Sequence, residues 1–231
     1  MANSMTMFQV ERSTISLLWS YTNMPPALPM PGTAAFAALI KSLRPYGINA
    51  SNIVTTRGGG NLGDIAITFG LVNREVTLRF TFSSFEVFAT SATEEIVRQT
   101  IEIIELVFNA LTLLDEETRN GRGKATINWH VKLLNNNATS LIKGYLIDKN
   151  SKHLKPEALS FKVEADQLSS LLDTRIVVMP SIQIEGGLFI EATYDFDSNK
   201  LREIEISLLS QFGEHLKLLF SLFDLQLAEA Q

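Results

Sequence analysis

The chain has 231 residues, of which 45% are hydrophobic and 19% are charged, a composition typical of a globular protein with enough apolar side chains for a core. The formal net charge is −5 and the lysines and arginines form no cluster, so we expect no nucleic-acid partner, which would require a basic face. Cysteine is absent, which excludes disulfides and thiolate sites, and because no signal-peptide pattern and no run of about 18 apolar residues occurs, we expect a cytoplasmic protein without a membrane span.

The first elements are predicted from alternation, capping and proline. Residues 8–21 alternate between apolar and polar side chains around Trp19, which predicts a strand. The prolines of residues 22–32 exclude a helix or strand interior in that segment. A short helix is predicted over residues 32–47, with Thr33 as its N-cap.

A glycine-rich stretch carries the spacing Gly-x-Gly-x-x-Gly at Gly58, Gly60 and Gly63. In dinucleotide-binding proteins this pattern opens a helix whose N-terminal N–H groups hold the pyrophosphate. Here residues 64–69 alternate in hydrophobicity like a strand, and no Gly-Lys-Ser/Thr follows. We therefore interpret the stretch as a loop between two antiparallel strands, beside Arg57, where a loop of this kind can line a binding site.

A meander and a long helix are predicted to complete the first half. Alternating segments with short connections continue to residues 85–89, which is typical of antiparallel strands. Ser91 and Glu94 fit a capping box and predict a helix that runs to about residue 118, with an apolar stripe from Val97 onward. Because a meander has one apolar face, we expect this helix to cover it.

The order of predicted elements recurs after the polar residues 119–124. We predict an α+β fold with an internal duplication: two tandem similar halves, residues 1–120 and 121–231, each an antiparallel meander sheet covered by a long C-terminal helix, with a short helix after the first strand. In the second half the first strand is centred on Trp129 and the final helix begins near residue 210. The alternative is one merged, irregular α+β domain without internal symmetry.

Over residues 8–118 the order of strand, helix, glycine-rich hairpin, meander and long helix resembles that of helix-grip ligand carriers such as the birch-pollen allergen family. Members of that family have more strands in the sheet and two helices after the first strand. The resemblance is one of topology, and no site residue is taken from it.

Catalytic and metal-binding motifs are absent from the sequence. The histidines, His130, His153 and His215, lack metal-ligand spacing, and no Gly-x-Ser-x-Gly elbow occurs. We therefore expect no metal and no cofactor and assign no catalytic residue. A Ser-His-Asp set stays open, because its members need only meet in space. We expect His130 on the polar face of its strand, turned toward solvent or a partner.

Four residues are candidates for ligand binding. Arg57 and Arg79 carry cations that could meet an anion from adjacent strands. Trp19 and Trp129 occupy similar places in the two predicted halves, where they are either core residues or, if the sheet face is open, the lining of an apolar cavity.

The sequence is compatible with three functions. The first is a non-catalytic intracellular binding or interaction protein that holds a small apolar ligand or a partner chain on a sheet–helix surface, as a homodimer through the last helix, which is apolar on all sides. The second is an enzyme that acts on a small anionic substrate through Arg57 or Arg79 with Glu203 or Glu205. The third is a structural assembly subunit.

Overall fold

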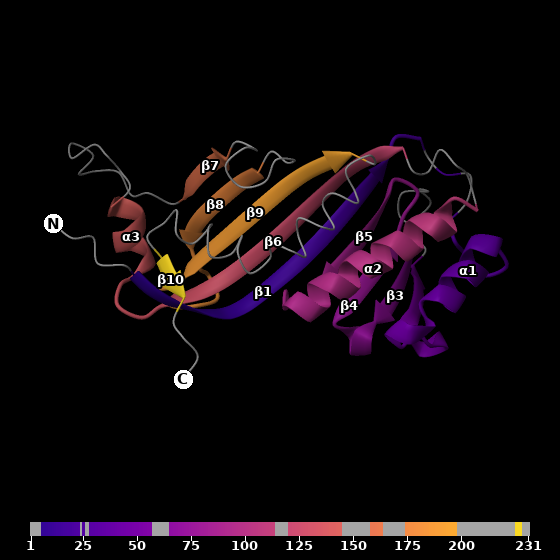
Figure 1. Cartoon of the computed structure of the whole chain (residues 1–231), viewed down its shortest axis with the longest axis horizontal. Coiled ribbons are helices and arrows are strands. Elements are labelled where there is room, and N and C mark those ends of the chain that lie inside the picture. The colour runs from indigo at the N-terminus through magenta and orange to yellow at the C-terminus, as the bar shows by residue number, and fades with distance from the viewer. Residues whose placement is uncertain are drawn as a thin grey trace. The chain divides into compact units, whose positions relative to one another are not determined.

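The structure is a computed structural model that describes residues 6–23, 25, 28–56, 65–113, 120–144, 158–163, 174–197 and 225–227. In these ranges the fold is α+β and is dominated by one large, mostly antiparallel sheet (Figure 1). The strands are β1 (Thr6–Tyr21), β2 (Ile53–Thr56), β3 (Ala66–Leu71), β4 (Val76–Phe80), β5 (Ser84–Ala89), β6 (Gly121–Leu133), β7 (Leu159–Val163), β8 (Thr174–Pro180), β9 (Leu188–Asp197) and β10 (Leu225–Leu227). The helices are α1 (Ala34–Ser42), α2 (Glu94–Leu111) and α3 (Ala138–Gly144), with 3-10 turns at Arg44–Tyr46, Ala50–Asn52 and Val72–Arg74.

The predicted pair of half-sheets, each covered by a long C-terminal helix, is wrong. The strand order is β2-β3-β4-β5-β1-β6-β9-β8-β7, so strands from both predicted halves belong to one sheet. The long strands β1 and β6, of 16 and 13 residues, are neighbours in that order. Their pairing satisfies backbone groups that two separate half-sheets would leave at open edges.

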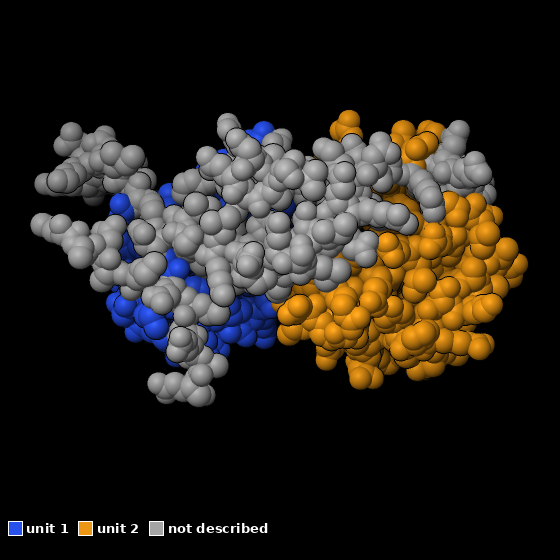
Figure 2. Space-filling view, in the orientation of Figure 1, with its two compact units in different colours: residues 1–14, 126–194, 206–231 blue, residues 15–125, 195–205 orange. Residues whose placement is uncertain are grey.

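The chain divides into two compact units, which Figure 2 shows in different colours. Unit 1 comprises residues 1–14, 126–194 and 206–231, and unit 2 comprises residues 15–125 and 195–205. Both β1 and β6 contribute residues to each unit. The division of the sequence into duplicated halves at residue 120 stays a prediction.

The core of unit 2 lies between the sheet and helices α1 and α2 (Figure 1). Phe108 of α2 meets the rings of Trp19 and Phe85 nearly edge-on, with centroids 5.0 and 5.2 Å away. Phe36 of α1 contacts Phe69 of β3 at 6.2 Å. Edge-to-face arrangements at these distances are favourable for aromatic rings, so the inward face of the strands is filled by large side chains.

The two helix starts in unit 2 differ in how well the sequence predicted them. Thr33 caps α1 as predicted, since its hydroxyl accepts from the Phe36 N–H at 3.1 Å. The predicted capping box at Ser91 is wrong, because Thr93 is the N-cap of α2 and its hydroxyl accepts from the Ile96 N–H at 3.3 Å. A cap at Thr93 also places two acidic residues in the first turn of α2, where the helix dipole favours negative charge.

The strands on either side of the glycine-rich stretch pair antiparallel, with Ile53 opposite Phe69 and Thr56 opposite Ala66. The prediction that a strand rather than a helix follows the glycines is therefore confirmed. Arg57 and the three glycines of the motif lie outside the described residues.

The core of unit 1 is built from alternate residues of β6, β8 and β9 together with α3, which contacts β8. The buried apolar side chains on these elements within unit 1 are Ile127, Trp129, Val131, Leu133, Ala138, Leu141, Ile142, Ile176, Val178, Leu188, Ile190, Ala192 and Tyr194. Successive strand residues point to opposite faces, so the intervening residues of each strand, His130 among them, lie on the other face of the sheet.

The C-terminal prediction is corrected where the structure describes it. Residues 225–227 form β10, a strand that pairs in parallel with Thr6–Phe8 of β1, and not the end of a helix. The remainder of the predicted last helix, and Glu203 and Glu205, lie outside the described residues. The homodimer contact assigned to that helix therefore stays a prediction. No helix in the described ranges has the length and apolar character to cross a membrane.

Candidate functional site

The face of the unit 2 sheet that points away from α1 and α2 carries a mixed set of side chains, which we name the open face. Alternation along β1, β3, β4 and β5 places these residues opposite the aromatic core. All are half-buried except Arg79, which is exposed. The open face consists of Ser16, Leu18, Thr68, Thr77, Arg79, Glu86 and Phe88.

Charged residues meet at the centre of the open face. Glu86 of β5 lies directly opposite Arg79 of β4 on one side and opposite Leu18 of β1 on the other. Its carboxylate also accepts a hydrogen bond of 2.8 Å from the Ser16 hydroxyl. Opposite charges in directly paired strand positions attract each other, so the Glu86 carboxylate has polar neighbours on both adjacent strands.

Two apolar side chains lie on the same face. Phe88 is paired with Ser16, and Leu18 is two residues further along β1, which makes Leu18 and Phe88 diagonal neighbours within reach of each other. Apolar residues at positions that otherwise carry Ser, Thr, Arg and Glu are the signal in the sequence that could have identified this surface.

Arg79 supplies an exposed positive charge to the open face. Within the described part of the chain, the ion pairs shorter than 4.0 Å both belong to Arg98, which contacts Glu95 at 2.7 Å and Glu102 at 3.0 Å on α2. An arginine outside such a pair can form a planar, two-pronged contact with a carboxylate.

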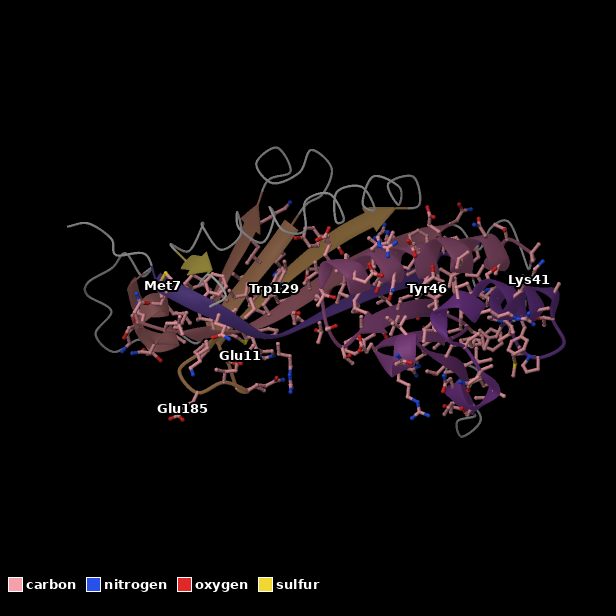
Figure 3. All side chains as sticks on the ribbon, turned by 60° about the horizontal axis from the view of Figure 1, so that its bottom comes forward. Met7, Glu11, Lys41, Tyr46, Trp129 and Glu185 are labelled. Atoms are coloured by element: carbon pink, nitrogen blue, oxygen red, sulfur yellow. The ribbon has the colours of Figure 1, made fainter. Side chains whose placement is uncertain are left out.

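The other predicted ligand-binding residues occupy different settings. Trp19 and Trp129 are each 2% exposed in the core, and they belong to unit 2 and unit 1 respectively (Figure 3 labels Trp129 on β6). Neither lies on the open face with Arg79. Their role in ligand binding stays a prediction, as does that of Arg57, which is outside the described ranges.

A second polar cluster surrounds His130 in unit 1. His130 lies on the polar side of β6 but is only 8% exposed, so the predicted solvent exposure is wrong. The other predicted alternative, that His130 faces a partner, stays a prediction. The His130 ring lies 4.9 Å from the ring of Phe189, and its Nδ1 is 2.9 Å from the Ser181 hydroxyl. Burial, and secondly the positive charge of Arg12, lower the pKa of His130 below the usual histidine value.

The Ser181 hydroxyl joins the His130 ring to the backbone that follows β8. The Ser181 hydroxyl oxygen already accepts from the N–H groups of Gln183 at 3.1 Å and Ile184 at 3.0 Å. A serine hydroxyl has two lone pairs and one proton, so its proton is the group left for the His130 Nδ1. Because two backbone N–H groups hold the hydroxyl and His130 is only 8% exposed, we assign the pair a structural role.

No group of histidine, aspartate and glutamate side chains with metal-binding geometry occurs in the described ranges. No protein-family model and no curated protein matches the sequence.

Proposed function

We propose that this is a non-catalytic binding protein that holds a partner protein chain on the open face of unit 2. The observation that carries the proposal is the combination of Leu18 and Phe88 with Arg79 and Glu86 on one side of the sheet. Aromatic residues and arginine are enriched in protein interfaces, and the opposite charges of Arg79 and Glu86 would favour one register of a complementary partner.

The opposite side of the sheet is a poorer candidate. The space between the strands and α2 is filled by Trp19, Phe85 and Phe108 in close ring contact. A ligand in that space would have to displace buried aromatic side chains, which cost about 3–5 kcal/mol each when they are removed from a core.

A protein chain fits the open face better than a small apolar ligand does. Small-molecule sites are mostly apolar and concave, whereas the open face is largely polar, with Leu18 and Phe88 as its apolar members. Polar side chains distributed over four strands suit many separate contacts with an extended surface.

The test compares three purified proteins as baits in a quantitative pull-down from cells of the source organism. They are the wild type, the double variant Leu18→Ser/Phe88→Ser, and the control Leu106→Ser/Leu113→Ser, which also replaces two large apolar side chains with serine, on and just after α2. We expect a protein that is captured by the wild type and the control, and whose purified form binds the open-face variant at least about tenfold more weakly by calorimetry.

Two results would contradict the proposal. One is equal binding of the purified partner to all three proteins. The other is a thermal shift with small apolar compounds that the open-face variant loses while no protein partner is found, which would assign the face to a small ligand.

A further inference from the structure

The connection between β8 and β9, residues 181–187, is held by a dense set of hydrogen bonds in unit 1. The Ser181 N–H donates to the Gly187 carbonyl at 2.8 Å, and the Gly187 N–H donates to the Ile184 carbonyl at 3.0 Å. Arg12 of β1 donates to the Gln183 side chain at 2.9 Å. These bonds fix the backbone of the connection.

The same connection carries an apolar side chain into solvent. Ile182 is 97% exposed, and Glu185 projects from the same segment (Figure 3). Because hydrogen bonds fix the backbone of the connection, the exposed Ile182 has a defined position. That position depends on the hydrogen bonds that hold the connection.

The Ser181 hydroxyl connects the loop to His130. It accepts from the Gln183 and Ile184 N–H groups, which leaves its proton for the Nδ1 of His130. The arrangement requires a lone pair on Nδ1 and is therefore specific to the neutral imidazole. A protonated ring would direct an N–H at an oxygen whose lone pairs are both in use.

We propose that the β8–β9 connection is a pH-controlled latch, closed on neutral His130 and opened when His130 binds a proton, so that acidification releases Ile182 from its fixed position. The proposal concerns unit 1 and does not depend on the function proposed for the open face of unit 2.

Burial and the Arg12 charge act on His130 in the same direction as the hydrogen bonds. The Arg12 guanidinium disfavours a second cation beside it, and burial removes the water that would solvate an imidazolium. When the connection opens, the ring gains access to water and can hold a proton as it does in an unfolded chain. The other charged residues on the elements around His130 are Glu11 on β1, Arg122, Lys124 and Lys132 on β6, Glu191, Asp195 and Asp197 on β9, and Glu185 in the connection.

The experiment follows amide hydrogen exchange of Gln183 and Ile184 in the full chain by NMR, with rates corrected for the intrinsic effect of pH. If only the open state binds the proton, with a pKa of about 6.5, opening becomes about tenfold more frequent by about pH 5.5 than at about pH 8. Because the closed state excludes the proton, the ring resonances of His130 should titrate below the ordinary histidine pKa of about 6.5.

The variant His130→Gln keeps an acceptor for the Ser181 hydroxyl but cannot titrate, so its loop amides should stay protected at both pH values. The variant His215→Gln is the matched control and should respond to pH like the wild type. If His130→Gln does not fold, Ser181→Ala replaces it and should show exchange that is fast at both pH values. Three results would overturn the latch. The first is amide protection in the wild type that is unchanged down to about pH 5.5. The others are a pH response that persists in His130→Gln and a pH response that is lost in His215→Gln.

Discussion

Gly121 at the start of β6 lies against the indole of Trp19: a Cβ added at Gly121 would be 2.8 Å from the indole Nε1 and would overlap the Ser20 carbonyl oxygen. Both contacts are with β1, the strand next to β6 in the sheet. Glycine is needed at this position for close approach, because any side chain would separate the two backbones.

The substitution Gly121→Ala should therefore destabilise the protein. Because the neighbouring atoms belong to a backbone carbonyl and a buried indole, we expect a loss of about 1–3 kcal/mol in the free energy of unfolding, the usual cost of overpacking. Urea denaturation followed by tryptophan fluorescence measures it. Gly144→Ala is the control, since an added Cβ there has no atom within 4 Å, and equal stabilities for the two variants would contradict the close packing.

The position of the α2 cap can be tested with two matched substitutions. Thr93→Ala removes the hydroxyl that accepts from the Ile96 N–H and should cost about 1 kcal/mol of stability. Ser91→Ala, at the position that the sequence alone favours, should have an effect within about 0.5 kcal/mol. Thermal or urea unfolding measures the stability of both variants. A larger loss of stability for Ser91→Ala would indicate that Ser91, and not Thr93, is the N-cap of α2.

Phe108 and Phe88 should respond very differently to truncation. Phe108 contacts Trp19 and Phe85 in the core of unit 2, so Phe108→Ala should cost about 3–5 kcal/mol. Phe88 is half-buried on the open face, and Phe88→Ala should cost less than about half of that. Comparison of the two denaturation midpoints is sufficient, and similar losses would mean that Phe88 is a core residue and not available to a partner.

The stability of the protein should fall with acidification through His130. Its pKa is lowered in the folded state, first by burial and then by Arg12, so the unfolded chain binds a proton at a higher pH than the folded chain does. The stabilisation from neutral His130 is therefore complete above the unfolded pKa of about 6.5 and is lost as the pH falls from there through the lowered folded pKa.

Urea denaturation at a series of pH values measures this dependence, and His130→Gln should reduce its slope below about pH 6.5. The control His215→Gln makes the same chemical change at another histidine and should leave the slope closer to that of the wild type than His130→Gln does. An unchanged slope in His130→Gln would assign the pH dependence to other groups.

Much of the local structure could be predicted from the sequence. Alternation identified the strands around Trp19 and Trp129, the hydroxyl of Thr33 before an apolar run identified the start of α1, and the strand after the glycine-rich stretch excluded a dinucleotide motif there. Alternation also placed Arg79 on the polar side of its strand, where the structure shows it exposed. These features depend on side chains within a few residues of one another.

The tertiary structure decided how those elements were combined. The strands of both predicted halves form one sheet. Residues 225–227, predicted to be helical, form β10 and pair with β1. His130, predicted on an exposed face, is buried in contact with Phe189 and Ser181. Strand pairing depends on backbone N–H and C=O groups that are the same at nearly every residue, so the sequence does not mark which distant strand will be the partner. Side-chain alternation determined the two faces of each strand in this protein, whereas backbone hydrogen bonding between distant segments determined which strands became neighbours.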